Sequence, residues 1–297
     1  MPANIDPAAI RVRAEQELRR QESIIDMNAF LDGLLARFNA RDTELTNRRL
    51  EEIVSALNAA GIESDRLLFG GSVARHTFVD GLSDIDALVI MKERPGSSPK
   101  DLIDDFGTAL RKHLPASMVE GVRVGTLAAT VSFPDGTEIQ LLPAIARGAD
   151  ALIASPDGSE WRAIRPRRFA KQLTSVNQAN GGRVVPTVKL AKALLQLNLP
   201  ERDQLSGYHV EAIAVRAFSA YAGPTRRDAM LQHLVSTAEE AVRRPLSDVT
   251  GQSPSVDQYL GPAGSPERER IAASLRRVNV QLKSASSEAA LRELFGE

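Results

Sequence analysis

Two aspartates stand at the head of an apolar run in this sequence, and they constrain its fold more than any other feature. Residues 67–91 read LLFGGSVARHTFVDGLSDIDALVIM, and Asp84 and Asp86 flank the start of the apolar run 85–91. Side chains alternate along a strand, so both carboxylates are expected on one face, about 7 Å apart along the backbone. Carboxylates held this close repel each other strongly unless a cation lies between them.

A divalent metal ion would relieve this repulsion. Mg²⁺, or Mn²⁺ in its place, takes oxygen ligands and usually combines one or two carboxylates with substrate phosphates. We therefore expect Asp84 and Asp86 to bind the metal. The alternative is a turn formed by Ser83-Asp84 and followed by a capping Asp86.

A glycine-rich turn precedes the aspartates by about a dozen residues. It consists of Gly70, Gly71 and Ser72, just before a segment that could start a helix. Glycines let backbone amides approach an anion, and a helix N-terminus favours phosphate. A phosphate cradle followed by paired carboxylates is suited to metal-assisted nucleotidyl transfer.

Local patterns indicate different structure in the two halves of the chain. The predicted elements are helices over 7–60, strands at 67–69 and 85–91, a helix over 98–114, strand material over 122–133, and a hairpin turn at 134–136 leading into 138–142. From about residue 164 the sequence is mostly helical, with a break at 261–270. We expect an α+β fold, in which 1–163 hold N-terminal helices and a small mixed sheet, and 164–297 form a helical lobe across a cleft.

Composition excludes several other classes of protein. The chain has 297 residues, a formal net charge of −1, no cysteine and four histidines. There is no global basic field to attract nucleic acid, and no disulfide, thiol nucleophile or cysteine-ligated zinc is possible. No apolar stretch reaches the ~18 residues of a membrane span, and the first residues lack the apolar core of a signal peptide. We expect a soluble, cytoplasmic protein with no membrane partner.

The motifs together resemble a known family. Gly71-Ser72 with Asp84-Ile85-Asp86 is similar to the signature of polymerase-β-type nucleotidyltransferases. Later segments resemble the CD-NTases, which are bacterial cyclic-oligonucleotide synthases, and the oligoadenylate synthetases. These segments are EIQLLPAI (138–145), VVPTVKLAKALLQLN (184–198), LSGYHVEAIA (205–214) and SDVTGQSPSVDQYLG (247–261).

The resemblance implies a function as well as a fold. It implies a polymerase-β-like core with a helical C-terminal lobe, ATP or another NTP as substrate, and Mg²⁺. It also implies a role in antiphage signalling of the CBASS type, in which a downstream effector would bind the oligonucleotide product.

One position departs from the family pattern. The family places a third carboxylate two residues before the Leu-Pro pair, where this chain has Gln140. Glutamine is a neutral oxygen ligand that cannot take a proton. Three readings stay open: Glu138 on the same strand face replaces the acid, Gln140 suffices as a weak ligand, or the site binds nucleotide without turning it over.

The helical half supplies further candidates for nucleotide binding. Lys189 and Lys192 share one face of a helix that is apolar nearly all round, so their charges must reach a cleft or an anion such as a triphosphate, or extend to solvent. In the resembled family a tyrosine equivalent to Tyr208 stacks on a nucleobase; otherwise it is a core residue. Gly207 stands where the family has serine, and Ser206 could take over that phosphate contact.

A basic segment at 162–171 offers a contact for nucleic acid. Its basic residues are Arg162, Arg165, Arg167, Arg168 and Lys171. Such a run can bind phosphate backbones, as tail addition to an RNA would require, or can be a solvated helix face. A non-catalytic nucleotide sensor is the third function considered. The leading prediction is an Mg²⁺-dependent nucleotidyltransferase that joins NTPs into a cyclic or short linear messenger.

Overall fold

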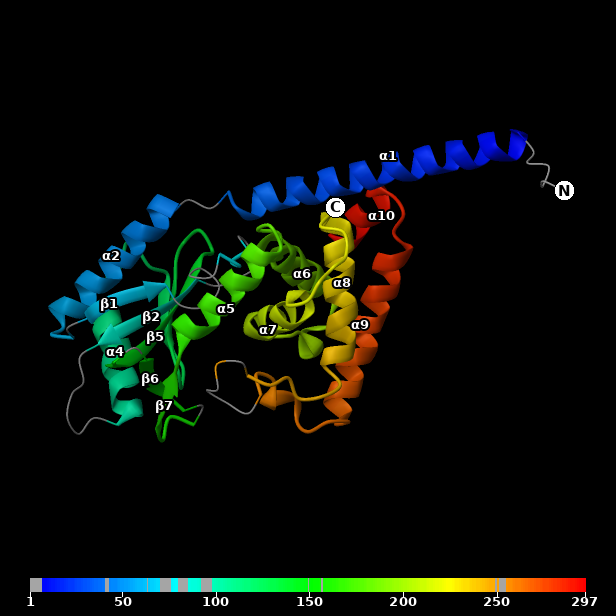
Figure 1. Cartoon of the computed structure of the whole chain (residues 1–297). Helices are drawn as coiled ribbons and strands as arrows, with labels where there is room; N and C mark the ends of the chain where they lie inside the picture. Colours follow the sequence, from blue (N-terminus) through cyan, green and yellow to red (C-terminus); the bar gives the residue numbers. More distant parts are fainter. Residues whose placement is uncertain are drawn as a thin grey trace. The chain divides into compact units, whose positions relative to one another are not determined.

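The structure is a computed structural model of the chain. It describes residues 7–40, 43–62, 64–69, 76–79, 85–91, 98–148, 150–155, 157–248, 250 and 255–297. Strands and helices fill the first half, and helices fill most of the second (Figure 1). This arrangement confirms the predicted α+β class.

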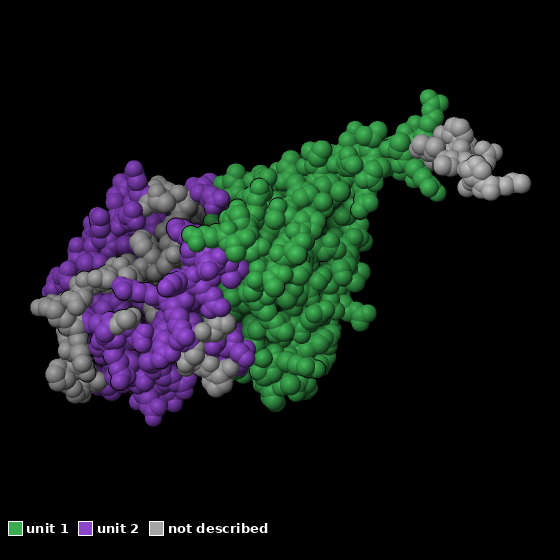
Figure 2. Space-filling model, viewed as in Figure 1, with its two compact units in different colours: residues 1–37, 177–246, 257–297 green, residues 38–176, 247–256 purple. Residues whose placement is uncertain are grey.

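Two compact units make up the chain, and each is discontinuous in sequence. Unit 1 contains residues 1–37, 177–246 and 257–297, and unit 2 contains residues 38–176 and 247–256 (Figure 2). This division differs from the boundary expected at residue 163. The N-terminal helix groups with the helices of the second half, and a short late segment groups with the sheet.

Unit 2 holds the sheet. Its elements are α2 (Thr43–Ala59), β1 (Ser64–Phe69), β2 (Ile85–Met91), α4 (Pro99–His113), β3 (Gly121–Val124), β4 (Ala129–Ser132), β5 (Glu138–Arg147), β6 (Asp150–Ala154), β7 (Trp161–Ile164) and most of α5 (Pro166–Ala179). The strand order is β1-β2-β5-β4-β3, and the β6–β7 hairpin extends from β5. The β2–β5 pair is parallel and the other pairs are antiparallel, so the predicted mixed sheet is confirmed.

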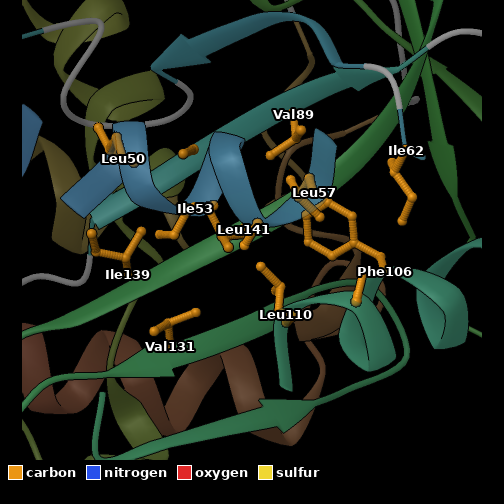
Figure 3. Close-up of a cluster of buried hydrophobic side chains, with 14 of the residues drawn as sticks. Leu50, Ile53, Leu57, Ile62, Val89, Phe106, Leu110, Val131, Ile139 and Leu141 are labelled. Carbon is orange, nitrogen blue, oxygen red and sulfur yellow. The ribbon is translucent and has the colours of Figure 1, made fainter. Parts of the chain in front are cut away.

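Helices α2 and α4 bury their apolar stripes against one face of this sheet. Figure 3 shows side chains from both helices meeting those of β2, β4 and β5. Phe106 and Leu110 of α4 are fully buried there, as are Ile139 and Leu141 of β5. Full burial of one such side chain contributes roughly 1.5–3 kcal/mol, so this cluster is the main stabilising element of the unit.

A reciprocal cap fixes the start of α4. Ser98 accepts a hydrogen bond from the Asp101 backbone N–H at 3.2 Å, and the Asp101 carboxylate accepts one from the Ser98 backbone at 3.3 Å. This reciprocal capping satisfies two of the donors that a helix leaves without intrahelical partners. Pro99 follows the cap, where proline's fixed backbone suits the first helical turn.

The opposite face of the sheet carries a smaller apolar cluster. Leu88 and Ile90 of β2 pack there with Ala144 of β5 and Ala151 of β6. Alternation along β5 places Gln140 on this same face, because Ile139 and Leu141 point into the main core. The cluster therefore fixes the two parallel strands close to the predicted site.

The β6–β7 hairpin was not predicted, because its strands are short. Asp150–Ala154 and Trp161–Ile164 pair only with each other and with the end of β5. The connecting turn includes Gly158, whose φ of 71° suits glycine.

Unit 1 is a helical unit. It contains α1 (Pro7–Phe38), α6 (Val184–Asn198), α7 (Gly207–Phe218), α8 (Arg227–Ala241), α9 (Pro266–Ser284) and α10 (Glu288–Leu294), with short 3₁₀ turns η1 (Glu201–Asp203) and η2 (Gln258–Leu260). Helix α6 is buried on most of its surface, as its sequence predicts. The second half of α1 packs onto this unit, and its first half projects beyond it (Figure 2). Within the described residues, no helix is both long enough and apolar enough to cross a membrane.

Candidate functional site

The sheet brings Asp86 and Gln140 into register. Strands β2 and β5 run parallel, and the Cα of Asp86 pairs with that of Gln140. Buried residues follow Asp86 along β2, starting with Ala87, which is 1% exposed. The main core therefore packs against one face of both strands. Asp86, the candidate acid, and Gln140, which stands at the position of the family's third acid, are neighbours on adjacent strands.

Several predicted site residues lie outside the described part of the chain. These are Gly71, Ser72 and Asp84, and only the backbone of Asp86 is described. Among the described residues no group of three or more His, Cys, Asp or Glu side chains forms a metal cluster. This finding does not test the metal site predicted at Asp84 and Asp86, because those carboxylates are not among the side chains described.

Glu138 pairs with residues of β4 and β3, which lie along the edge of β5 opposite to β2. Its carboxylate accepts hydrogen bonds from Arg123 at 2.9 and 3.0 Å and from the Ser132 hydroxyl at 2.7 Å. Ser132 lies on β4 and Arg123 on β3, whereas Asp86 lies on β2 across β5. To serve as a replacement ligand, Glu138 would have to leave this ion pair and turn toward β2.

Lys192 has a carboxylate partner within unit 1. Its Nζ lies 2.7 Å from Oε1 of Glu211 on α7, and the side chains are only 9% and 0% exposed. The charge of Lys192 is thus balanced inside the protein, whereas the sequence predicted a triphosphate or solvent as its partner. An isolated buried ammonium is very unfavourable, which explains a glutamate on the otherwise apolar inner side of α7.

Lys189 lies one turn before Lys192 on α6 and is half-buried. Burial lowers the pKa of Lys189, and the positive charge of Lys192 lowers it further. A nearby anion would oppose both effects by favouring the charged form. Both observed effects therefore disfavour the charged form of Lys189.

The first turn of α7 lies next to Lys192. Ser206 caps the helix by accepting a hydrogen bond from the His209 N–H at 3.2 Å. A Cβ built on Gly207 would lie 3.3 Å from Lys192 Nζ, so the ammonium approaches the backbone of this turn closely. Tyr208 follows Gly207 and is half-buried. The structure therefore brings Lys192, Ser206 and Tyr208 into one region of unit 1.

Two members of the basic segment hold a loop of their own unit. Arg165 and Arg168 donate hydrogen bonds to the Thr250 carbonyl at 3.1 and 3.2 Å, and Arg165 also pairs with Asp150 at 3.4 Å. Arg162, Arg167 and Lys171 remain exposed. The segment is therefore partly structural, and nothing in these contacts favours an RNA acceptor.

Sequence comparison places the chain in a family. The domain described as Second Messenger Oligonucleotide or Dinucleotide Synthetase matches residues 26–177, just over half of the chain. The chain belongs to this synthetase family. The matched region includes β2 and β5, with Asp86 and Gln140, and all other strands of the sheet. No curated protein matches the synthetase in sequence.

Solved structures support the same assignment at the level of the fold. The Bradyrhizobium diazoefficiens CD-NTase CdnG in complex with GTP has a TM-score of 0.69 at 15% identity, covering 91% of this chain and 96% of its own. Escherichia coli MS115-1 CdnC with ATP gives 0.66 at 17% identity, covering 86% and 90%. The Vibrio cholerae cyclic AMP-GMP synthase DncV, with a linear intermediate, gives 0.63 at 15% identity, covering 99% and 91%. The family match over residues 26–177 makes the synthetase a nucleotidyltransferase, and its fold is that of the CD-NTases.

Two residues that pair with predicted site residues of the synthetase were not predicted as their partners. Glu211 lies in the segment 205–214, where a glutamate in an otherwise apolar helix is a signal for a buried cation partner. Arg123 gave no comparable signal, because its pairing with Glu138 depends on the strand order β5-β4-β3. Both partners change how the predicted residues can act.

Proposed function

We propose that this synthetase is a metal-dependent nucleotidyltransferase that joins NTPs into a cyclic or short linear oligonucleotide messenger for antiphage defence. The observation that carries the proposal is the register of Asp86 with Gln140 on parallel strands, in a chain of this family. That register gives the two residues neighbouring backbone positions on a strand pair that packs against the core.

The residues at this place suit Mg²⁺ or Mn²⁺. Asp84 and Asp86 would hold the metal through carboxylate oxygens, and Gln140 would add a neutral amide oxygen. Both ions prefer such oxygen donors and leave room for substrate phosphates. When bound, the metal would polarise the phosphoryl oxygens and offset the negative charge that develops on them.

Other residues would hold the nucleotide. Gly71 and Ser72 would bind the β- and γ-phosphates of the donor, and Lys189, Lys192 and Ser206 would contact the triphosphate, with Tyr208 stacking on a base. Burial and Lys192 lower the pKa of half-buried Lys189, and a bound triphosphate would favour its charged form. Lys192 would act from within its pair with Glu211, so its contribution would be smaller than that of an uncompensated cation.

The proposed reaction is an in-line displacement at the α-phosphorus. A 3′- or 2′-hydroxyl oxygen forms the new P–O bond while the bond to the leaving pyrophosphate breaks. Gln140 cannot take the hydroxyl proton, so the proton must pass to Asp84, Asp86 or water. The engaged state of Glu138 supports Gln140 over Glu138 as the third oxygen donor.

The test compares products by mass spectrometry after incubation with the four NTPs and Mg²⁺ or Mn²⁺. Wild-type protein should release pyrophosphate and form an oligonucleotide, and Asp84→Asn and Asp86→Asn should each lose at least about 100-fold of the rate, as expected for loss of a metal ligand. Asp104→Asn is the control, because this exposed acid lies on α4. Equal product from wild type and Asp84→Asn would defeat the proposal.

Gln140 motivates a second candidate, a nucleotide sensor without turnover. This reading predicts that ATP with Mg²⁺ raises the unfolding temperature while no pyrophosphate appears. Gln140→Asp should then create synthase activity. Turnover by the wild-type protein excludes this candidate.

A further inference from the structure

A series of polar contacts connects the η2 turn to the first turn of α7. The hydroxyl of Tyr259 lies 3.0 Å from Nδ1 of His209, and the Ser206 backbone N–H points to the same hydroxyl oxygen at 3.4 Å. The rings of His209 and Tyr259 meet edge to face, with centroids 6.0 Å apart. These contacts join the η2 turn to the residue that caps α7.

The chemistry of the groups fixes the direction of the Ser206–Tyr259 hydrogen bond. Burial lowers the pKa of His209 to about 4, so its ring is neutral at neutral pH. A backbone N–H can only donate, so the Tyr259 oxygen accepts from Ser206, whereas the bond between the Tyr259 hydroxyl and Nδ1 takes its direction from the tautomer of His209. The other ring nitrogen of His209, Nε2, lies 3.7 Å from Oδ2 of Asp257. This nitrogen has no hydrogen-bond partner among the described residues.

A buried ion pair between Arg268 and Asp257 lies next to His209 in the same series of contacts. Arg268 and Asp257 are both 0% exposed, and their side chains meet at 2.7 Å. Arg268 also donates to the carbonyls of Val242 and Gly261 at 2.9 Å, and the Asp257 carboxylate accepts from the Leu246 N–H at 3.0 Å. With so many bonds satisfied, the segment that carries Tyr259 is held firmly.

The ring of Tyr259 has little burial to explain its presence. The residue is 53% exposed, while its hydroxyl reaches inward to His209, which is fully buried. Besides the edge-to-face contact of its ring with His209, Tyr259 contributes the hydrogen bonds of its hydroxyl group. The residue it reaches, Ser206, begins the turn in which Gly207 lies next to the Lys192 ammonium.

We infer that Tyr259 is a positioning residue, whose hydroxyl sets the orientation of the Ser206–Tyr208 turn relative to Lys192. This inference rests on the proposed function, which assigns that turn to nucleotide binding. Tyr259 itself contacts no reacting atom in this scheme. It acts through the Ser206 backbone and through His209, both of which are hydrogen-bonded to its hydroxyl group.

The test measures nucleotide affinity by calorimetric titration with each NTP and Mg²⁺. Tyr259→Phe keeps the ring and loses the hydroxyl, and we expect it to raise the Kd about five- to tenfold, the value of one hydrogen bond. Its unfolding temperature should stay within about 2 °C of wild type, since the ring is half exposed. Tyr221→Phe is the matched control, because its hydroxyl bonds Pro224 at 2.8 Å elsewhere in unit 1.

A second pair of variants separates positioning from packing. His209→Asn keeps an acceptor near the place of Nδ1 and should retain a Kd within about twofold of wild type, whereas His209→Leu should match Tyr259→Phe. A Tyr259→Phe variant that binds NTP as tightly as a binding-competent wild type would overturn the inference and leave the proposed function standing. Wild-type protein that binds no NTP would overturn both.

Discussion

Lys192 and Glu211 form a buried ion pair, 2.7 Å long, between the middle of α6 and the first turns of α7. Mutation of this pair can separate two roles, namely the binding of nucleotide and the compensation of a buried charge. Lys192 belongs to the predicted triphosphate site, and its partner keeps the folded protein free of an uncompensated buried charge.

Glu211→Gln should destabilise unit 1 and increase its response to nucleotide. Breaking a buried pair on one side costs about 3–5 kcal/mol, because the remaining charge stays buried. A bound triphosphate could replace the lost carboxylate, so ATP with Mg²⁺ should stabilise the variant more than wild type in urea denaturation. The double variant Lys192→Met, Glu211→Leu is the control. It should recover stability and lose nucleotide affinity, and an unchanged affinity would show that Lys192 is purely structural.

Glu138→Gln should leave synthase activity within about threefold of wild type. Its carboxylate is held by Arg123 and Ser132 on the far side of β5, and a half-exposed pair of this kind contributes at most about 1 kcal/mol. Gln140→Ala should instead lower the rate by at least about tenfold, because an oxygen beside Asp86 is lost. Product yield per hour is the measurement. The reverse order of effects would identify Glu138 as the working ligand.

Gly107→Ala should destabilise unit 2. A Cβ at this position of α4 would overlap the Val124 side chain on β3, and overpacking a tight contact typically costs about 1–3 kcal/mol. The matched control is Gly33→Ala on α1, where a Cβ meets nothing within 4 Å. That change should stabilise the protein by about 0.5–1 kcal/mol through helix propensity. Equal effects of the two changes in chemical denaturation would contradict the packing at Gly107.

Stability should fall as the pH is lowered from about 6.5 to about 4. Burial lowers the pKa of His209 from 6.5 to about 4, so in this window the unfolded chain binds a proton that the folded chain excludes. The stability present above pH 6.5 is therefore lost progressively, by roughly 2–3 kcal/mol, until the folded state also takes the proton. His209→Asn cannot titrate, and its unfolding free energy should vary less over the same window. An identical slope in both proteins would show that other groups control this range.

Local sequence patterns predicted the elements whose signals are contained within a few turns. The strand at Ile85–Met91 follows from an apolar run, and the hairpin turn at 134–136 follows from its Pro-Asp-Gly sequence. The helix predicted over 98–114 is observed as α4. The strands β6 and β7 were missed, because they are short and depend on the end of β5 for pairing.

Contacts between distant parts of the chain could not be predicted in this way. The register of Asp86 with Gln140 requires two strands to be chosen as parallel neighbours. The partners Glu211 and Arg123 become visible only when α7 meets α6 and when β3 joins the sheet through β4. The candidate acids are thus a prediction from local sequence, whereas the partners Glu211 and Arg123 depend on contacts that only the folded chain provides.

Helix α1, at the start of the chain, packs against residues near its end. Its Phe30 ring meets Phe295 edge to face at 6.1 Å, and the Ser23 hydroxyl bonds the Ser286 carbonyl, 263 positions along the chain. On the ribosome these contacts of α1 can form only after residues 286–295 have been translated. A nascent chain would therefore expose part of the apolar surface of α1 during most of its synthesis. Chaperones that cover apolar surfaces should change the yield of folded enzyme more than the stability of the folded state.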